Sequence, residues 1–543
     1  MKRTEGTPAA SGNCPPPPEP KELSPEEQKL KAEREARKKA KEEEKAAKEA
    51  AKLAKKQAQE AAAAVLVKES SDFEADSFGY WPLVQSEGGP SSGLKAAAKR
   101  QWVPVGQLDA KEGSIAFVTL REGTETVQCV FGDSCSKDLL RWLAAVPAES
   151  LIDVWGRIVS PQTPVASTTQ RKELQGEKVF CVVKAKKELP FQLKDAMQPE
   201  DEQKEGQIRV HLETRLDNRC LDLRVSGTAA VARVTSEVSR YCRDFLHQHG
   251  FVEIHTPKII GGASEGGASC FRVPYFNRDA CLAQSPQLYK QMCIAGDMGK
   301  VYEIGPVFRA ENSNTHRHLC EFVGVDLEME IKEDFLEAVE VIDNLFKSIF
   351  KRLEVDAAKD SALIRAQHDV PPFVFLEETP RLTFAEGIKM LREAGIGVDT
   401  IPEDLAEFDL STELEKALGR LVQEKYKTDY FFLLKYPAKV RPFYSMPCPN
   451  DPKYSNTFDV FMRGEEIASG AQRVHDAGLL RRRCEALGVP LEQLKSYIDA
   501  MDLGAPPHAG MGAGLERIVM LYYGLGNIRR VSLFPRDPKR LAP

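Results

Sequence analysis

The sequence lacks several features that would assign it to a special class of protein. Its 543 residues contain no apolar run near the ~18 residues of a membrane-spanning helix, and residues 1–20 are polar and proline-rich rather than a secretory signal. The 12 cysteines include no CxxC pair. This spacing excludes a zinc ribbon and a disulfide scaffold, and it predicts reduced thiols. We therefore expect a cytoplasmic protein with no membrane partner.

Strong charge of one sign is also missing, since the formal net charge is only −6. That total hides a contrast, because residues 1–68 carry a net +4 and the remainder carries −10. The lysines of the first segment are spaced three and four residues apart, which places them on one helical face. Such a face suits either a solvated spacer helix held by ion pairs or a surface that follows a phosphate backbone. The small net charge therefore does not exclude a nucleic-acid partner.

Composition divides the chain into five segments. Residues 1–70 are rich in Lys, Glu and Ala and predict a charged helix after a disordered start, and residues 71–100 have the composition of a linker. About five short β-rich runs in residues 101–190 predict a small β-barrel, with the OB-fold as the leading candidate. Residues 191–225 are polar and suit a hinge. Helical and β patterns alternate in residues 226–543, so we expect an α+β multidomain protein.

The segment 300–330 has the pattern of a β-hairpin with one polar face. Because side chains alternate along a strand, Arg309, Glu311, Phe322 and Asp326 share one side of the hairpin. A ring for stacking, a guanidinium for phosphate and carboxylates for donors are what a nucleotide requires. The alternative is a surface hairpin with ordinary ion pairs, which the clean apolar opposite face disfavours.

A second candidate lies near the C-terminus. Gly510, Gly512 and Gly514 alternate before a helix that carries Arg517 in its first turn. A strand face without side chains predicts close approach of a ligand to the backbone, and a helix N-terminus with an arginine favours anions. Close packing of helix and strand alone is the alternative interpretation.

Two acidic stretches complete the candidates. Glu265 lies in the glycine-rich stretch 261–269, which is either a surface turn or a lid over a small charged substrate. Asp459 and Glu466 lie in neighbouring apolar stretches. One or two carboxylates together with phosphates are the usual ligands of Mg²⁺, so this pair is a candidate metal site.

Three stretches resemble the three signature motifs of class II aminoacyl-tRNA synthetases, and they are residues 250–257, 305–322 and 512–517. Three further short sequence motifs are similar to those of aspartyl-tRNA synthetases of the eukaryotic cytosolic type. They are residues 264–267, 284–291 and 532–537. The similarity extends from about residue 78 to the end of the chain. The lysine-rich extension is also typical of that type.

The resemblance implies an aspartate–tRNA ligase. Such an enzyme activates L-aspartate with ATP to aspartyl-adenylate and transfers aspartate to the 3′ end of tRNA-Asp. It would have a catalytic domain with an antiparallel sheet flanked by helices, and an OB-fold that binds the anticodon. The family also implies Mg²⁺ with the ATP and a homodimer formed through the first motif. The N-terminal helix is in addition a candidate contact for other synthetases.

The resemblance carries residue roles over by position. The catalytic residues would be Arg309 and Arg517. The aspartate-binding residues would be Ser264, Glu265, Gln287, Lys290, Arg309, Asp326, Ser469 and Arg473. The ATP-binding residues would be Arg309, Glu311, Arg317, His318, Leu319, Phe322, Glu466, Gly514 and Arg517. The Mg²⁺ ligands would be Asp459 and Glu466. The tRNA contacts would be Phe117, Gln128 and Glu173 at the anticodon, and Lys41, Lys45, Lys48 and Lys52 along the backbone.

Some alternatives stay open. A phenylalanine of the barrel core is the other interpretation of Phe117, and the shortened segment 103–113 leaves the details of anticodon reading undecided. If Arg473 and Lys290 both faced the substrate, asparagine would leave two buried cations uncompensated, which predicts at least ~10³-fold rejection. Charging of tRNA-Asn, or the asparagine enzyme itself, is the near alternative. A catalytically inactive paralogue that only binds tRNA or partner proteins is disfavoured, because Arg309, Glu311, Glu466 and Arg517 are all present.

Overall fold

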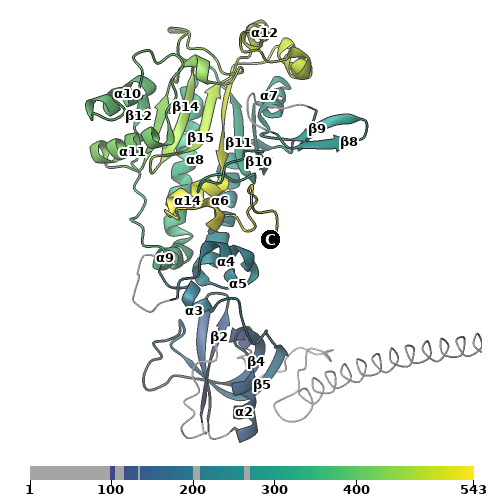
Figure 1. Ribbon diagram of the computed structural model, residues 1–543, viewed down its shortest axis with the longest axis vertical. Helices are drawn as coiled ribbons and strands as arrows, with labels where there is room; N and C mark the ends of the chain where they lie inside the picture. The colour runs from purple at the N-terminus through teal and green to yellow at the C-terminus, as the bar shows by residue number, and fades with distance from the viewer. Residues whose placement is uncertain (1–97, 104–114, 133–134, 200–207, 262–269) are drawn as a thin grey trace, which may run out of the picture. The chain divides into compact units, whose positions relative to one another are not determined.

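The computed structural model describes residues 98–103, 115–132, 135–199, 208–261 and 270–543 (Figure 1). The chain divides into two compact units, residues 1–187 and 188–543. The predicted charged helix lies outside the described residues, and so do six candidate site residues: Ser264, Glu265, Lys41, Lys45, Lys48 and Lys52. Within the described ranges, no helix is long and apolar enough to cross a membrane.

The first unit contains a closed barrel of five strands in the order β1-β2-β3-β5-β4. The strands are β1 (Ala98–Val103), β2 (Ala116–Glu122), β3 (Glu125–Phe131), β4 (Ser150–Val159) and β5 (Glu173–Val183). Along β2, Ala116 and Val118 are buried whereas Phe117 between them is exposed. This alternation follows from the two-residue period of a strand. Each of the five β-rich runs expected from the sequence overlaps one strand.

The barrel unit also has a helix that the sequence did not lead us to expect, α2 (Lys137–Ala145). The Ser136 hydroxyl accepts a hydrogen bond from the Leu139 amide at 3.1 Å and caps its first turn. Leu139, Leu140 and Leu143 then pack into the same apolar cluster as the barrel strands. The helix therefore extends the core of the barrel.

The second unit is built on an eight-stranded sheet in the order β12-β13-β14-β15-β16-β11-β10-β6. The strands are β6 (Val252–Glu253), β10 (Lys300–Phe308), β11 (Glu321–Glu330), β12 (Arg381–Thr383), β13 (Tyr430–Leu434), β14 (Thr457–Met462), β15 (Glu465–Gln472) and β16 (His508–Gly514). From β13 through β10 every neighbouring pair is antiparallel, and the short edge strands β12 and β6 pair parallel. The expected α+β domain with a largely antiparallel sheet is confirmed.

One face of this sheet is covered by helices. The helices that share its apolar core include α6 (Ser226–Gln248), α8 (Leu336–Val355) and α14 (Leu515–Tyr522) (Figure 1). On β11, Val325, Leu327 and Met329 belong to this core, as the alternation predicted. The intervening side chains of β11 point to the other face, where the candidate site lies.

The remaining helices lie around this framework. They are α7 (Gln287–Ala295), α9 (Ala358–Gln367), α10 (Phe384–Glu393), α11 (Thr412–Tyr426), α12 (Ala477–Ala486) and α13 (Lys495–Asp502). The long helix α6 begins at Ser226. It is followed by Gly250 with φ of 78°, a left-handed conformation that suits the end of a helix.

Short elements fill the stretch before α6 and the one that follows the first signature motif. The polar stretch 191–225 forms α3 (Leu193–Ala196), α4 (Leu212–Asp217) and α5 (Arg219–Asp222). A small three-stranded sheet has the order β7-β9-β8, with β7 (Ile259–Ile260), β8 (Arg272–Tyr275) and β9 (Arg278–Leu282). Arg215 and Arg219 each bond the buried Asp222 at 2.6 Å. The described part of this stretch is therefore packed within the second unit.

Candidate active site

A cavity of about 360 Å³ lies on the open face of the large sheet. Most candidate residues of the second unit line it. From β10, β11 and the loop between them come Arg309, Glu311, Arg317, His318, Leu319, Phe322 and Asp326. From other elements come Gln287, Glu466, Ser469, Arg473, Gly514 and Arg517. The structure therefore brings together residues that are separated by more than half of the second unit's length.

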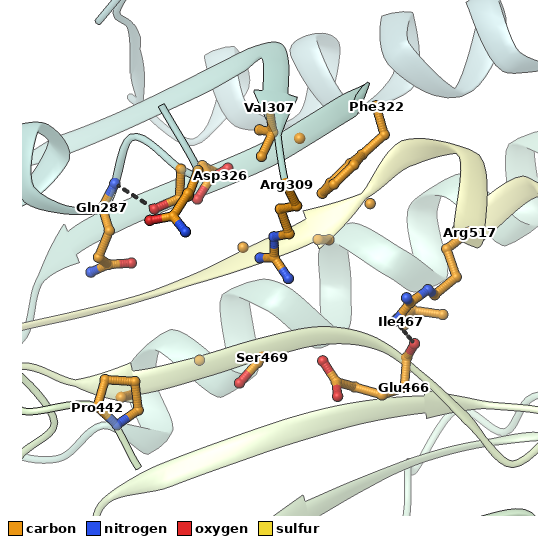
Figure 2. A pocket seen from close by; sticks show the side chains of 18 of the residues that line it. Gln287, Val307, Arg309, Phe322, Asp326, Pro442, Glu466, Ile467, Ser469 and Arg517 are labelled. Carbon is orange, nitrogen blue, oxygen red and sulfur yellow. Dashed lines mark hydrogen bonds between the residues drawn. The ribbon is translucent and has the colours of Figure 1, made fainter. Parts of the chain in front are cut away.

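The cavity has two chemically different ends (Figure 2). Gln287 and Asp326 lie at one end, Phe322, Glu466 and Arg517 lie at the other, and Arg309 lies between them. The strand register explains part of this layout, because Val307 pairs with Phe322 in the antiparallel hairpin. Arg309 follows β10 directly instead of lying within it, because the strand ends at Phe308.

At the first end, two buried cations are bonded to two buried carboxylates. Lys290 Nζ lies 3.1 Å from Asp326 Oδ1 and 3.5 Å from Glu328 Oε2, and it donates to the Met511 carbonyl at 2.8 Å. Its side chain is only 1% exposed and does not line the cavity. In this arrangement Lys290 can influence a ligand in the cavity only through its charge and through Asp326.

Arg473 is the cation that reaches the cavity wall. Its Nε donates to Glu328 Oε1 at 3.0 Å, and its Nη2 donates to Glu328 Oε2 at 3.3 Å and to the Gly510 carbonyl at 2.9 Å. Nη1 has no hydrogen-bond partner among the described residues. Burial alone would raise the pKa of Glu328, but Arg473 and Lys290 hold it below its usual value. One nitrogen of a fixed, fully charged fork is thus left for a ligand.

Gln287 supplies a second uncommitted donor at this end. Its side-chain Nε2 is buried with no hydrogen-bond partner among the described residues, and the residue lies in the first turn of α7 and lines the cavity. Buried polar groups in proteins are nearly always hydrogen-bonded. An unsatisfied amide beside Arg473 therefore suits a ligand with acceptor oxygens.

The alternating glycines of β16 serve this arrangement in a way that differs from the expectation. A Cβ at Gly510 would lie 2.2 Å from the Leu327 carbonyl oxygen and 2.3 Å from Glu328 Oε2, and one at Gly512 would lie 2.9 Å from Asp326 Oδ1. The space at these two positions is therefore occupied by the backbone and carboxylates of β11 and not by a ligand, which corrects the prediction there. At Gly514 the nearest atom is 3.7 Å away, so only this glycine leaves the backbone open.

At the other end, arginines and an aromatic ring form a surface for a flat, negatively charged ligand. The Arg309 guanidinium carbon lies 5.6 Å from the centre of the Phe322 ring. Arg517 donates from Nη1 to the Glu466 carbonyl at 2.9 Å and from Nη2 to the Arg317 carbonyl at 3.3 Å (Figure 2). These two contacts hold the Arg517 side chain across the cavity from Phe322. A heterocycle fits between a ring and a guanidinium, with its phosphates towards Arg309.

Two glutamates at this end, Glu466 and Glu415, have pKa values above their usual range. Burial raises the pKa of Glu466, and Asp459 raises it further against the effect of Arg517. Burial, followed by Glu466 and Asp459, raises the pKa of Glu415 on α11 to about 7. Burial and the negative charge of Asp459 therefore outweigh the nearby arginines at Glu466, which favours a further cation beside this carboxylate.

Asp459 has a partner that sequence analysis missed. Arg441 donates to it from Nη2 at 2.6 Å and from Nη1 at 3.2 Å, and also bonds Ser469 at 3.3 Å. Burial by itself would lower the pKa of Arg441, but Asp459 raises it. Asp459 lies behind the cavity wall whereas Glu466 lines it. No local pattern marks Arg441, because it lies in a loop between β13 and β14.

The loop between β10 and β11 carries the remaining candidates. Arg317 donates to Glu415 Oε2 at 3.1 Å and to the Thr412 hydroxyl at 2.8 Å. His318 lies 3.8 Å from Glu311. Burial lowers the pKa of His318, although Glu311 opposes this effect. The loop thus presents its charged side chains on the cavity side while α11 holds one of them.

On the barrel, the three candidate residues are near one another on neighbouring strands. Phe117 is 41% exposed, so the alternative of a barrel-core phenylalanine is wrong. Gln128 pairs with Glu173 across β3 and β5, and its side-chain amide donates to that carboxylate at 3.0 Å. An exposed ring beside a polar pair is a surface that can stack on a base and bond its edge.

Comparisons with known proteins agree with this geometry. The family model of class II tRNA synthetases (D, K and N) matches residues 211–538. The cytoplasmic aspartate–tRNA ligase of Mus musculus is 47% identical over 491 residues, which cover 88% of this chain and 97% of the mouse protein. Two solved structures are also similar to this chain.

The first is described as an aspartyl-tRNA synthetase from Leishmania major, with 38% identity, a TM-score of 0.78, and coverage of 88% of this chain and 100% of that chain. The second is the asparaginyl-tRNA synthetase of Pyrococcus horikoshii complexed with asparaginyl-adenylate, with 28% identity, a TM-score of 0.68, and coverage of 82% and 95%. The chain therefore belongs to the class II tRNA synthetases of the D, K and N group.

Proposed function

We infer that the protein is an aspartate–tRNA ligase that uses ATP as a substrate. The observation that carries this conclusion is a cavity with Arg473 in its wall and the buried Lys290 behind it at one end, and a ring with arginines at the other. The 47% identity to the mouse enzyme over 88% of the chain supports the same activity. That relative is named cytoplasmic, and we assign the same location here.

The reaction follows from the order of groups along the cavity. The α-carboxylate of aspartate attacks the α-phosphorus of ATP in line and releases pyrophosphate, and the terminal ribose 3′-hydroxyl of tRNA-Asp then attacks the adenylate. Arg309, which lies between the two ends, is in place to hold the α-phosphate and the attacking carboxylate. No protein nucleophile is needed, so catalysis consists of positioning and charge stabilisation.

For aspartate, we propose that the side-chain carboxylate bonds Arg473 Nη1 and that Gln287 and Asp326 contact the amino-acid backbone, with Ser469 on the neighbouring strand. The structure changes the reason for rejecting asparagine. Both buried cations already have carboxylate partners, so asparagine would not leave them uncompensated. It would instead place an amide donor where Arg473 offers only donors, and a site built for one hydrogen-bonding pattern rejects the other strongly.

For ATP, we propose that adenine lies between Phe322 and Arg517, and that Glu311 and the backbone near Leu319 and Gly514 contact the base and ribose. Arg317 and His318 would bind the outer phosphates. Arg517 supports this arrangement because its two hydrogen bonds fix it across from Phe322. These contacts use a ring face and guanidinium groups, the types of interaction that adenine and phosphate favour.

For the metal, we propose that Glu466 and Asp459 hold Mg²⁺ together with the phosphates of ATP. The residues fit this ion, because burial and then Asp459 raise the pKa of Glu466, which favours a neighbouring cation. No group of three or more His, Cys, Asp or Glu side chains among the described residues forms a metal cage. Mg²⁺ commonly takes only one or two carboxylates and completes its shell with phosphate and water. When bound, it would neutralise phosphate charge.

For tRNA, we propose that the barrel is an OB-fold that binds the anticodon, with Phe117 stacking on a base and Gln128 and Glu173 reading base edges. The strand order and the exposed Phe117 support this assignment.

We further propose that the lysine stripe Lys41, Lys45, Lys48 and Lys52 follows the tRNA backbone, and that Ser264 and Glu265 belong to a lid over aspartate. Deleting residues 1–67 should weaken tRNA affinity and flatten its salt dependence while sparing adenylate formation.

We also propose that the enzyme is a symmetric homodimer formed through the first motif, residues 250–257, and that the N-terminal helix is a candidate contact for other synthetases. Sedimentation of the active enzyme tests the first proposal. An active species with the 60.4 kDa mass of one chain would contradict it.

The activity is tested by exchange of labelled pyrophosphate into ATP with each amino acid separately and in competition. We expect exchange that depends on aspartate and is insensitive to equimolar asparagine. Dominance of asparagine would overturn the choice of substrate, and no exchange with either amino acid would overturn the ligase assignment itself.

A further inference from the structure

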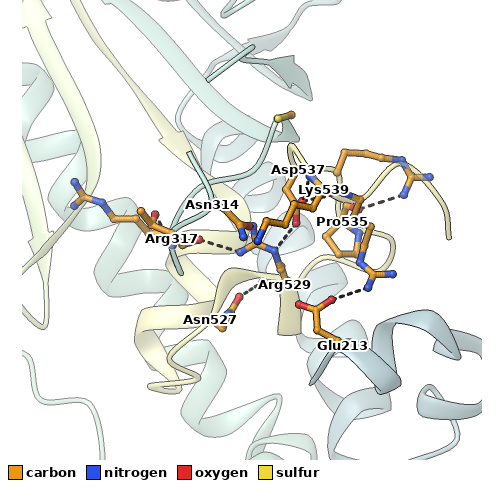
Figure 3. Close-up of polar contacts among 12 residues, drawn as sticks. Glu213, Asn314, Arg317, Asn527, Arg529, Pro535, Asp537 and Lys539 are labelled. Atoms are coloured by element: carbon orange, nitrogen blue, oxygen red, sulfur yellow. Dashed lines mark hydrogen bonds and ion pairs between the residues drawn. The ribbon is translucent and has the colours of Figure 1, made fainter. Parts of the chain in front are cut away.

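The loop 312–318, which carries Arg317 and His318, rests on the last segment of the chain (Figure 3). That segment contains a short 3-10 helix, η4 (Ile528–Arg530), and continues to residue 540. The Ile528 amide donates to the His316 carbonyl at 2.8 Å, and the Cys320 amide donates to the Arg536 carbonyl at 2.7 Å. The loop is therefore bonded to the C-terminal segment on both sides of Arg317.

Arg529 makes the central contacts between the two segments. Its Nη1 donates to the Thr315 carbonyl at 2.9 Å, and its Nη2 donates to Asn314 Oδ1 at 2.7 Å. Its Nε donates to Asp537 Oδ2 at 2.6 Å. All three guanidinium nitrogens are thus engaged, two of them by the loop.

Arg529 and its partner Asp537 are themselves held in place by burial and by further hydrogen bonds. The side chains of Arg529 and Asp537 are 5% and 4% exposed. Asp537 Oδ1 accepts hydrogen bonds from the amides of Lys539 and Arg540 at 2.8 and 2.9 Å. Burial alone would raise the pKa of Asp537, but Arg529 and these amides lower it. A planar fork bonded to a fixed carboxylate leaves its other two nitrogens little freedom.

These contacts determine where Arg317 can be. In Figure 3 the Arg317 side chain points away from Arg529, and its carbonyl accepts a hydrogen bond from Arg517 Nη2 at 3.3 Å. Arg529 lines no part of the cavity, so it acts on the ligand only through the loop. A displacement of about 1 Å in a positioning element can reduce a rate by about a hundredfold.

We propose that Arg529 is a positioning residue for the nucleotide, which fixes loop 312–318 so that Arg317 and His318 meet the outer phosphates of ATP. The inference rests on the proposed function, because it concerns the ATP site of that reaction. It assigns a role to a residue that lies outside the three signature motifs and outside the cavity.

The test compares Arg529→Lys with the unaltered full-length enzyme in pyrophosphate exchange. Lysine can keep the bond to Asp537 but cannot reproduce the fork. We expect the KM for ATP to rise at least about tenfold while the KM for aspartate stays within about twofold, because only one substrate meets the loop. A general loss of folding would alter both KM values or the thermal unfolding, so the split between substrates separates the two explanations.

Two further variants make the result decisive if Arg529→Lys does not fold. Asn314→Ala removes one acceptor from the exposed loop and leaves the buried pair intact, and it should raise the KM for ATP in the same direction. Arg540→Lys is the matched control, because Arg540 lies in the same segment but bonds Glu213 and Asp217 at 2.8 and 2.7 Å. It should leave both KM values unchanged.

The outcomes separate this inference from the proposed function. If the unaltered enzyme shows no aspartate-dependent pyrophosphate exchange, the proposed function is contradicted. Normal exchange in the unaltered enzyme, with unchanged KM for ATP in Arg529→Lys and Asn314→Ala, would overturn the role of Arg529. An equal rise in the KM for ATP in Arg540→Lys would do the same, because the effect would then belong to the whole segment.

Discussion

The two ends of the cavity contain similar side chains but balance their charges differently. At the end of the cavity proposed for aspartate, Lys290 and Arg473 are bonded to Asp326 and Glu328. These cations lower the pKa of Glu328 despite its burial. At the end proposed for ATP, by contrast, burial and then Asp459 raise the pKa of Glu466. One end is internally compensated, whereas at the other end burial and Asp459 outweigh the arginines around Glu466.

For the proposed function, the difference predicts how each end would select its ligand. A compensated pair of cations and carboxylates is rigid, so it can present a fixed pattern of donors, which suits discrimination between aspartate and asparagine. An acidic end with raised pKa values is electrostatically incomplete, which suits a substrate that brings a metal ion. The same residue types thus serve selectivity in one place and cation binding in the other, according to how they are paired.

The largest expected effect comes from breaking the compensated end with Arg473→Leu. Glu328 is fully buried, and removal of its partner should destabilise the fold by about 3–5 kcal/mol. Aspartate-dependent exchange should fall at least about a thousandfold. Thermal unfolding and pyrophosphate exchange measure the two effects separately.

The double variant Arg473→Leu with Glu328→Gln separates stability from recognition. A neutral amide needs no counter-charge, so most of the lost stability should return while exchange stays absent. Robust exchange in either variant would falsify the assignment of Arg473 to the aspartate carboxylate.

A smaller effect is expected at the incomplete end from Glu466→Gln. Removal of this charge should raise the Mg²⁺ concentration needed for half-maximal exchange at least about tenfold. Asp459→Asn should have a weaker effect, because Asp459 is already bonded to Arg441. An unchanged Mg²⁺ requirement in Glu466→Gln would show that this end does not hold the metal.

The smallest expected effect is a change in how stability depends on pH. The pKa of Glu415 is raised to about 7, mainly by burial and then by Glu466, whereas its ordinary value is 4.5. Between these values the folded chain binds more protons than the unfolded chain. The stability from this group is therefore complete below about pH 4.5 and is lost as the pH rises through about 7.

Glu415→Gln should remove that dependence. Between about pH 5 and about pH 8, the free energy of unfolding should fall by about 1–3 kcal/mol more in the unaltered protein than in the variant. Denaturant unfolding at both pH values measures it, and Glu413→Gln, an exposed position on the same helix, is the control. If the free energy of unfolding changed equally with pH in the unaltered protein and in Glu415→Gln, burial and the neighbouring Glu466 would not raise the pKa of Glu415 as stated.

Local patterns were sufficient for a large part of the site. The alternation along 300–330 placed Phe322 and Asp326 on one face, and the observed pairing of Val307 with Phe322 and of Glu303 with Asp326 confirms that face. The position of Arg517 in the first turn of α14 is confirmed as well. Such features are predictable because the period of a strand or helix depends only on neighbouring residues.

Features that depend on distant partners were not predictable in this way. The glycines of β16 were interpreted as space for a ligand, but Gly510 and Gly512 accommodate the carboxylates of β11. Arg441 and Arg529 were missed because their partners, Asp459 and the loop 312–318, lie far from them in sequence or in another element. The spacing of side chains along one strand or helix does not show which other segment will pack against it.

The sequence by itself determined the family, the reaction and most of the residues around the cavity, because the motifs are local and their side-chain types are chemically specific. The tertiary structure decided how those charges are paired. Lys290 lies behind Asp326, and Nη1 of Arg473 has no hydrogen-bond partner among the described residues. Loop 312–318 is bonded to Arg529. Pairing depends on distances between segments that only the folded chain brings together, and in a buried site it is the pairing that sets both pKa and selectivity.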